Sequence, residues 1–168
     1  MPSATTGAAA SSATASKGAE AAKSEALMEL LDAVDFEQAV IFVSCSEQAG
    51  GVQKLLAEMG LSALAVHEAV EESQRATNCA LFRGFEGRVL VATDVGLVVC
   101  DAALGKKVNL VINYDVPEDT EEYARCVSRA GLDGQPSFAI SFAADAYEEA
   151  SLTHFGRRLG VRFGEPLG

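Results

Sequence analysis

A short apolar segment that ends in two polar residues constrains the fold of this 168-residue chain more than any other feature. Residues 89–92 read Val-Leu-Val-Ala and lie between Arg88 and the pair Thr93-Asp94. The segment is too short for a helix and too apolar for a strand with one wet face, so it predicts a parallel strand buried on both faces. Ligands of such sheets bind beyond the carboxyl ends of the strands, which makes Thr93 and Asp94 candidate site residues.

Similar apolar segments alternate with helical patterns along most of the chain. The further predicted strands are residues 39–43, 63–66, 108–112 and 138–142. Predicted helices are one capped by Ser24, one ending at Gly60, one over 71–82, one capped by Asp119, and one beginning near Asp145 with Leu152, Phe155 and Leu159 facing inward. Connections too long for hairpins predict a mainly parallel sheet with helices on both faces, and they leave the strand order open.

The chain divides into a polar lead and one domain. Residues 1–22 are nearly all Ala, Ser, Thr and Gly, without an amphipathic period, and we expect them to form a disordered lead. An organelle transit peptide is the alternative, although the first twenty residues contain no Arg. Residues 23–166 are long enough for a single domain with its own core.

Charge and hydropathy limit the partners. The formal net charge of -11 opposes phosphate backbones, so we expect only weak RNA binding by the chain alone, through a few local cations. No apolar run is long enough to span a bilayer and no secretory h-region is present, so we expect no membrane contact and an intracellular protein.

The cysteines do not form a metal-binding pattern. Cys45, Cys79, Cys100 and Cys126 are widely spaced, without a Cys-x-x-Cys, and the chain has two histidines. We therefore expect buried thiols rather than zinc ligands or disulfides, and no metal site.

Nucleotide and hydrolase motifs are missing. The sequence has no Gly-x-x-x-x-Gly-Lys-Ser/Thr, no Gly-x-Gly-x-x-Gly and no Gly-x-Ser-x-Gly, so it has no phosphate loop of its own. What remains is a set of polar residues at strand and helix ends: His67, Arg75, Thr93, Asp94, Asp101, Arg125 and Arg129. His67 is a base or a structural hydrogen-bonding group, and Arg129 either reaches a polyphosphate or forms a surface salt bridge.

Several segments together resemble the second RecA-like lobe of DEAD-box RNA helicases. They are residues 40–43, His67 with Arg75, and residues 88–94, 108–115 and 127–131. The run from Asn113 to Asp119 and the Arg129-Ala-Gly sequence look most like the branch that works in pre-mRNA splicing and mRNA export. The resemblance covers about residues 23–166. It implies an α/β fold, a RecA-like lobe of the P-loop NTPase type, with a mainly parallel sheet of five to six strands.

The resemblance also implies site residues and partners. Arg75, Thr93 and Asp94 correspond to RNA-backbone contacts, Arg129 to an arginine that reaches the γ-phosphate of ATP, and Asp101 to a ribose contact. ATP with Mg would bind only in combination with a first RecA-like lobe, supplied in cis or in trans. The implied function is that of the second lobe of an ATP-dependent RNA helicase, inactive alone, in the nucleus with mRNA-export or splicing proteins, or else in the cytoplasm.

The chain departs from the family pattern at several positions. Val98 and Val99 replace an Arg and a Gly, Leu132 replaces the outer arginine finger, and Glu68 stands where the family has Arg. Loss of one finger slows phosphoryl transfer by roughly 10³ or more. Two other functions therefore stay open: a degenerate helicase-like lobe that acts as a protein-binding or regulatory module, and an unrelated α/β domain without nucleotide chemistry.

Overall fold

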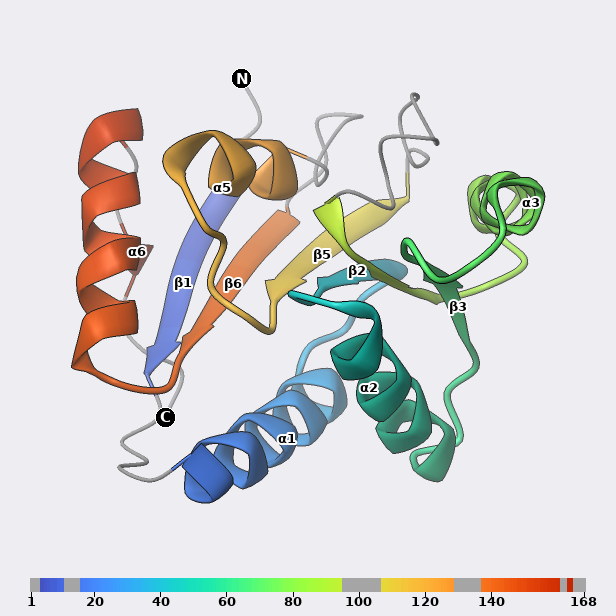
Figure 1. Cartoon of the computed structure of the whole chain (residues 1–168), viewed down its shortest axis with the longest axis horizontal. Helices are drawn as coiled ribbons and strands as arrows, with labels where there is room; N and C mark the ends of the chain where they lie inside the picture. Colours follow the sequence, from blue (N-terminus) through green and yellow to red (C-terminus); the bar gives the residue numbers. More distant parts are fainter. Residues whose placement is uncertain (1–3, 11–15, 95–106, 129–136, 161–162, 165–168) are drawn as a thin grey trace.

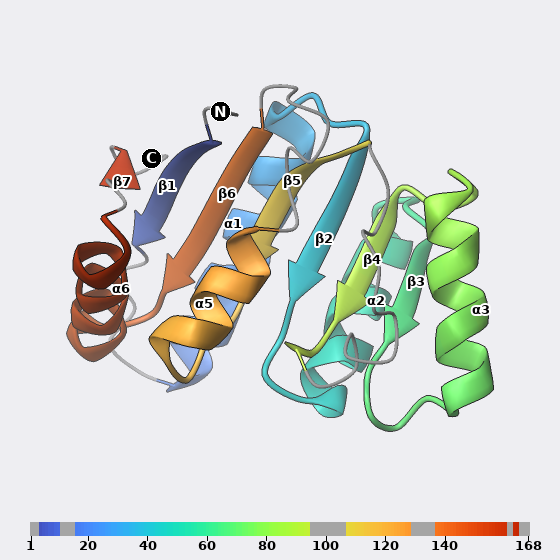
Figure 2. The same ribbon diagram turned by 90° about the horizontal axis from the view of Figure 1, so that it is seen from above.

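The computed structural model describes residues 4–10, 16–94, 107–128, 137–160 and 163–164. Within them, seven strands form one parallel sheet in the order β3-β4-β2-β5-β6-β1-β7 (Figures 1 and 2). The strands are β1 (Ala4–Ala10), β2 (Gln38–Phe42), β3 (Ala63–Val66), β4 (Val89–Ala92), β5 (Val108–Asn113), β6 (Ser137–Ala143) and β7 (Phe163–Gly164). The helices are α1 (Ser16–Ala33), α2 (Ser46–Glu58), α3 (Glu72–Arg83), α5 (Thr120–Val127) and α6 (Ala146–Leu159).

Helices cover both faces of the sheet, as predicted. Figure 1 shows α1 and α2 on one face and α3, α5 and α6 on the other. Successive residues of β2 serve the two layers: Ile41 packs in the cluster with α1 and α2, whereas Val40 and Phe42 pack in the cluster with α3 and α5. Every residue of β2 is buried, which is the expected environment of a central parallel strand.

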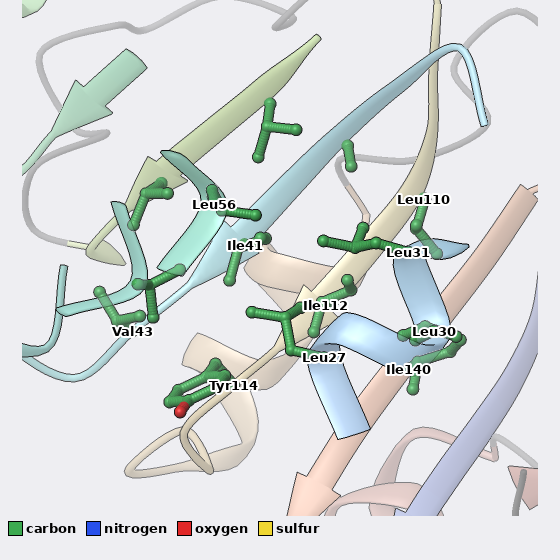
Figure 3. Packing of buried hydrophobic residues seen from close by; sticks show 14 of the residues in the cluster. Leu27, Leu30, Leu31, Ile41, Val43, Leu56, Leu110, Ile112, Tyr114 and Ile140 are labelled. Atoms are coloured by element: carbon green, nitrogen blue, oxygen red, sulfur yellow. The ribbon is translucent and has the colours of Figure 1, made fainter. Parts of the chain in front are cut away.

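The layer under α1 forms the larger hydrophobic core. Leu27, Leu30 and Leu31 of α1 pack against Ile112 and Ile140 of the sheet (Figure 3). Leucines three and four positions apart thus lie on the same face of α1. At roughly 25 cal/mol per Å² of apolar surface removed from water, each fully buried leucine stabilises the fold by about 2 kcal/mol.

The helix ends follow their predicted signals in most cases. The Asp119 and Asp145 side chains accept hydrogen bonds from the backbone N–H groups of Glu122 and Glu148, both at 2.8 Å. Gly60 follows Met59, the C-cap residue of α2, and has φ 77°, a left-handed conformation that glycine adopts without steric cost.

Two helical predictions are wrong. Ser24 does not cap α1, because the helix begins at Ser16; the Ser24 hydroxyl instead lies 3.2 Å from the Tyr114 hydroxyl. Leu159 is 39% exposed rather than inward-facing, since α6 ends there and the left-handed Gly160 follows.

The N-terminal segment differs from the expectation of a disordered lead. The structure places Ala4–Ala10 in β1, paired in register with β6, and starts α1 at Ser16. With β7, this strand extends the sheet beyond the five to six strands expected. A strand of this kind is held by backbone hydrogen bonds to its neighbours, and the side-chain pattern of an Ala/Thr/Gly segment does not reveal such pairing.

The cysteine expectation holds in part. Cys126 is a buried thiol, Cys45 is a thiol of intermediate burial, and Cys79 is disulfide-bonded, so the prediction is wrong for Cys79. Cys100 lies outside the described residues. In the portion that the structure describes, no helix has the length and hydropathy needed to cross a membrane.

Candidate functional site

The sheet has a switch point between its adjacent strands β2 and β5. The chain leaves β2 through α2 on one face toward β3, and it leaves β5 through α5 on the opposite face toward β6 (Figure 2). The connections that follow two such strands turn to opposite faces and leave a crevice between them, which is where α/β sheets bind ligands. A hollow of about 40 Å³ lies here, lined among others by Ser44, Asp94, Asp115 and Glu122. Ligand pockets usually measure about 300–1,000 Å³, so this crevice is at most part of a larger site.

Thr93 lies at this edge, immediately after β4. Its side chain is only 3% exposed, and its backbone N–H donates to the carbonyl of Val66 at the end of β3, at 3.1 Å. The hydroxyl Oγ1 donates to Oε2 of Glu68 at 3.0 Å. The loop after β3 therefore brings a carboxylate onto the predicted RNA-contacting hydroxyl.

Asp94, the next residue, is held by Arg125 of α5. Nε and Nη2 of Arg125 donate to the two carboxylate oxygens of Asp94, at 3.1 and 2.7 Å. The Asp94 side chain is 15% exposed and that of Arg125 is 52% exposed. The hydrogen bond to Asp94 is the main reason why the pKa of Arg125 is raised. Two parallel charge-assisted bonds fix the guanidinium plane and leave its outer edge in solvent.

Two other carboxyl groups at this edge have shifted pKa values. The pKa of Glu68 is lowered, chiefly by a hydrogen bond from its own backbone N–H, with the Thr93 hydroxyl also contributing, so Glu68 is charged at neutral pH. Burial raises the pKa of Glu122, and the charge of Asp94 raises it further. Glu68 and Asp94 thus bring negative charge to this edge, where the guanidinium of Arg125 is exposed.

Arg75 lies in the first turn of α3, which begins at the edge where β3 and β4 end (Figure 2). Its side chain is half-buried, and Nε is a buried donor without a hydrogen-bond partner in the structure. Most buried donors in proteins are paired, so an unpaired guanidinium nitrogen at a predicted phosphate contact is notable. His67 has a structural contact instead: its Nδ1 accepts from the backbone N–H of Ala69 at 3.2 Å, which favours the structural interpretation over a catalytic base.

Asp115, in the wall of the crevice, connects the loop after β5 to the loop after β2, to α2 and to α1. Its carboxylate accepts from the backbone N–H of Ser44 at 2.8 Å and from Gln48 at 3.2 Å, and it lies 3.4 Å from Nζ of Lys23. Lys23, on α1, is 5% exposed and also lies 3.5 Å from Glu148 of α6. These ion pairs fix the loop after β5 between α1, α2 and α6.

Part of this arrangement was predictable from the sequence. Thr93, Asp94 and Arg75 lie at one edge of the sheet, as their strand-end and helix-start positions predicted. Asp101 and Arg129 lie outside the described residues. Glu68 was recognised as a departure, but its bond to Thr93, the Asp94–Arg125 pair and the Lys23 network were not predicted. Lys23 lies one helical turn before Leu27 on the packed face of α1, and this position was a sequence signal for that network.

The described residues contain no group of three or more His, Cys, Asp or Glu side chains that could hold a metal ion. Two of the carboxylates that line the crevice are engaged by protein donors: Asp94 by Arg125, and Asp115 by Ser44 and Gln48. A magnesium ion would therefore need ligands beyond these.

The parallel sheet, the helices on both faces and the polar groups gathered at the switch point define a RecA-like α/β lobe. The family described as the helicase conserved C-terminal domain matches residues 22–134. Among solved structures, the C-terminal domain of S. cerevisiae Dbp5 bound to Gle1 and IP6 has a TM-score of 0.82 at 22% identity, covering 97% of this chain and 89% of that one. E. coli SrmB bound to RraA has a TM-score of 0.84 at 20% identity, covering 100% and 93%.

Curated relatives give the same family at higher identity. ATP-dependent RNA helicase SUB2 of Ajellomyces capsulatus is 36% identical over 146 residues, which are 87% of this chain and 32% of the relative. DEAD-box ATP-dependent RNA helicase 56 of Oryza sativa subsp. japonica is 37% identical over 149 residues, 89% and 34% of the two chains. The chain belongs to the helicase conserved C-terminal domain family and is a C-terminal lobe of the DEAD-box type. It spans about a third of the length of these relatives.

Proposed function

We propose that the chain acts as the second lobe of an ATP-dependent RNA helicase and is inactive without a first RecA-like lobe. Arg75, Thr93 and Asp94 contact the RNA backbone, while Arg129 and Asp101 contact the γ-phosphate and the ribose of ATP. The observation that carries the proposal is the position of Thr93 and Asp94 at the carboxyl end of β4, beside the switch point and at the edge where α3 presents Arg75. The 40 Å³ crevice supports a shared site, because a nucleotide needs a second wall.

The described groups suit binding and positioning rather than metal chemistry. The buried, unpaired Nε of Arg75 can donate to a phosphate oxygen once the side chain turns toward solvent, and Asp94 orients the Arg125 guanidinium at the rim. Mg bound with ATP neutralises charge on the phosphates and would take its ligands from the first lobe, since the described part of this chain has no cluster for it. Lobe closure then brings an arginine to the transferring phosphoryl group. A guanidinium at this place raises the rate of phosphoryl transfer by orders of magnitude.

A fusion to a first lobe tests this proposal. The first lobe of a SUB2 relative is joined to the 168-residue chain, and ATP hydrolysis is measured with and without single-stranded RNA. We expect RNA-stimulated hydrolysis that Arg129→Ala reduces by about 10³-fold. Arg158→Ala, a change of the same kind in the exposed last turn of α6, should leave the rate unchanged. A folded fusion without RNA-stimulated hydrolysis would contradict the proposal.

A second candidate is a degenerate lobe that serves as a protein-binding or regulatory module. Both predicted RNA-contacting side chains at the end of β4 already have partners within the chain, which favours this function. Glu68 binds the Thr93 hydroxyl, and Arg125 binds Asp94. The Dbp5 domain bound to Gle1 and SrmB bound to RraA are lobes of this fold that have protein partners. Under this function, a purified partner binds the isolated chain equally well with and without Arg129→Ala. A loss of binding on that change would argue for the helicase function.

The cellular setting follows from the same resemblance. Likeness to the splicing and export branch, together with relatives named SUB2, supports a nuclear role with mRNA-export or splicing proteins; the cytoplasm is the alternative. The distribution of a fluorescent fusion between nucleus and cytoplasm tests it. Exclusion from the nucleus would contradict the nuclear assignment.

A further inference from the structure

The loop between β3 and α3 places an anion on the strand-end hydroxyl. Oε2 of Glu68 accepts the Thr93 hydroxyl at 3.0 Å, although the two residues are 25 positions apart in the sequence. Parallel pairing of β3 with β4 explains the contact, because Val66 pairs with Ala92 and each strand then continues into this loop region. Thr93 is nearly inaccessible, whereas Glu68 is exposed, so the carboxylate covers the hydroxyl from the solvent side.

A carboxylate and a phosphate diester compete for the same donor. Both are anionic acceptors that bind hydroxyl and N–H groups, and one hydroxyl has a single proton to donate. Glu68 is ionised at neutral pH, since its own backbone N–H, Thr93 and the backbone of Ser46 all stabilise the charged form. A phosphate that approaches Thr93 must displace this group and tolerate its charge nearby.

We infer that Glu68 is a specificity residue that acts as an internal competitor of the RNA phosphate at Thr93. This inference rests on the proposed function and describes how the same edge is regulated. RNA gains the Thr93 contact only when the Glu68 side chain swings out toward solvent, which its exposure permits. The lobe therefore binds RNA backbone more weakly than its strand-end residues would otherwise allow.

The test measures affinity of the 168-residue chain for a single-stranded ten-nucleotide oligoadenylate RNA. Fluorescence anisotropy is read at about 50 and 200 mM salt, where phosphate contacts weaken with added salt. Glu68→Gln removes the charge but keeps an acceptor, and Glu68→Ala removes both. We expect binding about threefold tighter for Glu68→Gln and about tenfold tighter for Glu68→Ala at low salt, with smaller gains at high salt.

A matched control separates this local effect from net charge. Glu58 is an exposed carboxylate at the last residue of α2, the end remote from the crevice, and Glu58→Gln changes the net charge by the same amount as Glu68→Gln (Figure 1). If the Glu68 variants gain no more RNA affinity than Glu58→Gln, the inference is overturned. Circular dichroism of each variant confirms that it is folded.

A further variant tests the assigned hydroxyl. Adding Thr93→Val to Glu68→Ala should cancel most of the gain, because the competitor acts chiefly through this donor; a full gain that persists would overturn the inference. Failure of the proposed function has a different signature, in which Arg75→Ala leaves RNA affinity unchanged in every background. If Arg75→Ala weakens binding while the Glu68 variants stay at the control value, only the inference about Glu68 is wrong.

Discussion

Arg125 and Asp94 form a bidentate ion pair that joins the end of β4 to the last turn of α5. The two N···O distances are 2.7 and 3.1 Å, and the residues are 31 positions apart. Strands β2 and β5 lie between β4 and β6 in the sheet, so the pair spans the switch point from one side to the other. A carboxylate that the family resemblance assigns to RNA is thereby also the group that orients the exposed guanidinium.

Removal of Arg125 should destabilise the fold only modestly. Exposed ion pairs contribute about 0–1 kcal/mol, and the planar bidentate geometry places this one near the upper end of that range. We expect Arg125→Ala to lower the free energy of unfolding by about 1 kcal/mol. A urea-denaturation double-mutant cycle with Asp94→Ala should give a coupling of about 0.5–1 kcal/mol. Arg157→Ala, which removes an exposed arginine from the last turn of α6, serves as the control, and zero coupling between positions 94 and 125 would contradict the prediction.

The main elements of the fold could be predicted because their signals are local. The apolar segments at 39–43 and 89–92 can be satisfied only by burial on two faces, and Asp119 and Asp145 cap helices through contacts three residues away. Strand β1 could not be predicted in this way. Its pairing with β6 depends on backbone groups more than 130 residues apart, which composition does not encode.

The candidate site was predictable in position and not in its contacts. A strand end is a local property, so the position of Thr93 and Asp94 at the sheet edge could be predicted from the sequence. Their partners Glu68 and Arg125 depend on which strands are neighbours, and the alternating pattern leaves that order open. The same reason hid the contact of Lys23 with Asp115, residues that are 92 positions apart.

Neutralising Lys23 should destabilise the fold clearly. Its ammonium group lies 3.4 Å from Asp115 and 3.5 Å from Glu148, and the lysine side chain is 5% exposed. Removal of one partner leaves partly buried carboxylates uncompensated, which costs about 3–5 kcal/mol for fully buried pairs. Because these carboxylates keep some exposure, we expect Lys23→Met to lower the free energy of unfolding by about 2 kcal/mol. Lys54→Met, on the exposed side of α2, should cost less than about 0.5 kcal/mol; equal losses in urea denaturation would contradict the role of Lys23.

Phe85 has a backbone conformation that favours glycine. Its φ is 64°, and its ring is 52% exposed, so little burial offsets the strain. The left-handed conformation costs roughly 1–2 kcal/mol for a residue with a Cβ. Phe85→Gly should therefore be more stable than Phe85→Ala by about 1 kcal/mol, since the two variants lose the same ring and only the glycine loses the strain. At a position with ordinary φ, a glycine variant is less stable than the alanine variant. Thermal stability of Phe85→Ala equal to or greater than that of Phe85→Gly would therefore contradict the strained conformation of Phe85.

Tyr123 should make stability depend on pH above pH 10. The side chain is fully buried against Phe155, and burial raises its pKa to about 12, with a hydrogen bond to Ser141 opposing the shift. The unfolded chain releases this proton near pH 10, while the folded chain keeps it, so stability is intact below pH 10 and falls as the pH rises to about 12. A shift of two pKa units corresponds to about 2–3 kcal/mol. Urea denaturation at pH 9 to 12 should show this loss in the wild-type chain and in Tyr147→Phe, whose tyrosine is 81% exposed, and not in Tyr123→Phe. An identical pH dependence in all three proteins would mean that groups other than Tyr123 cause the alkaline loss.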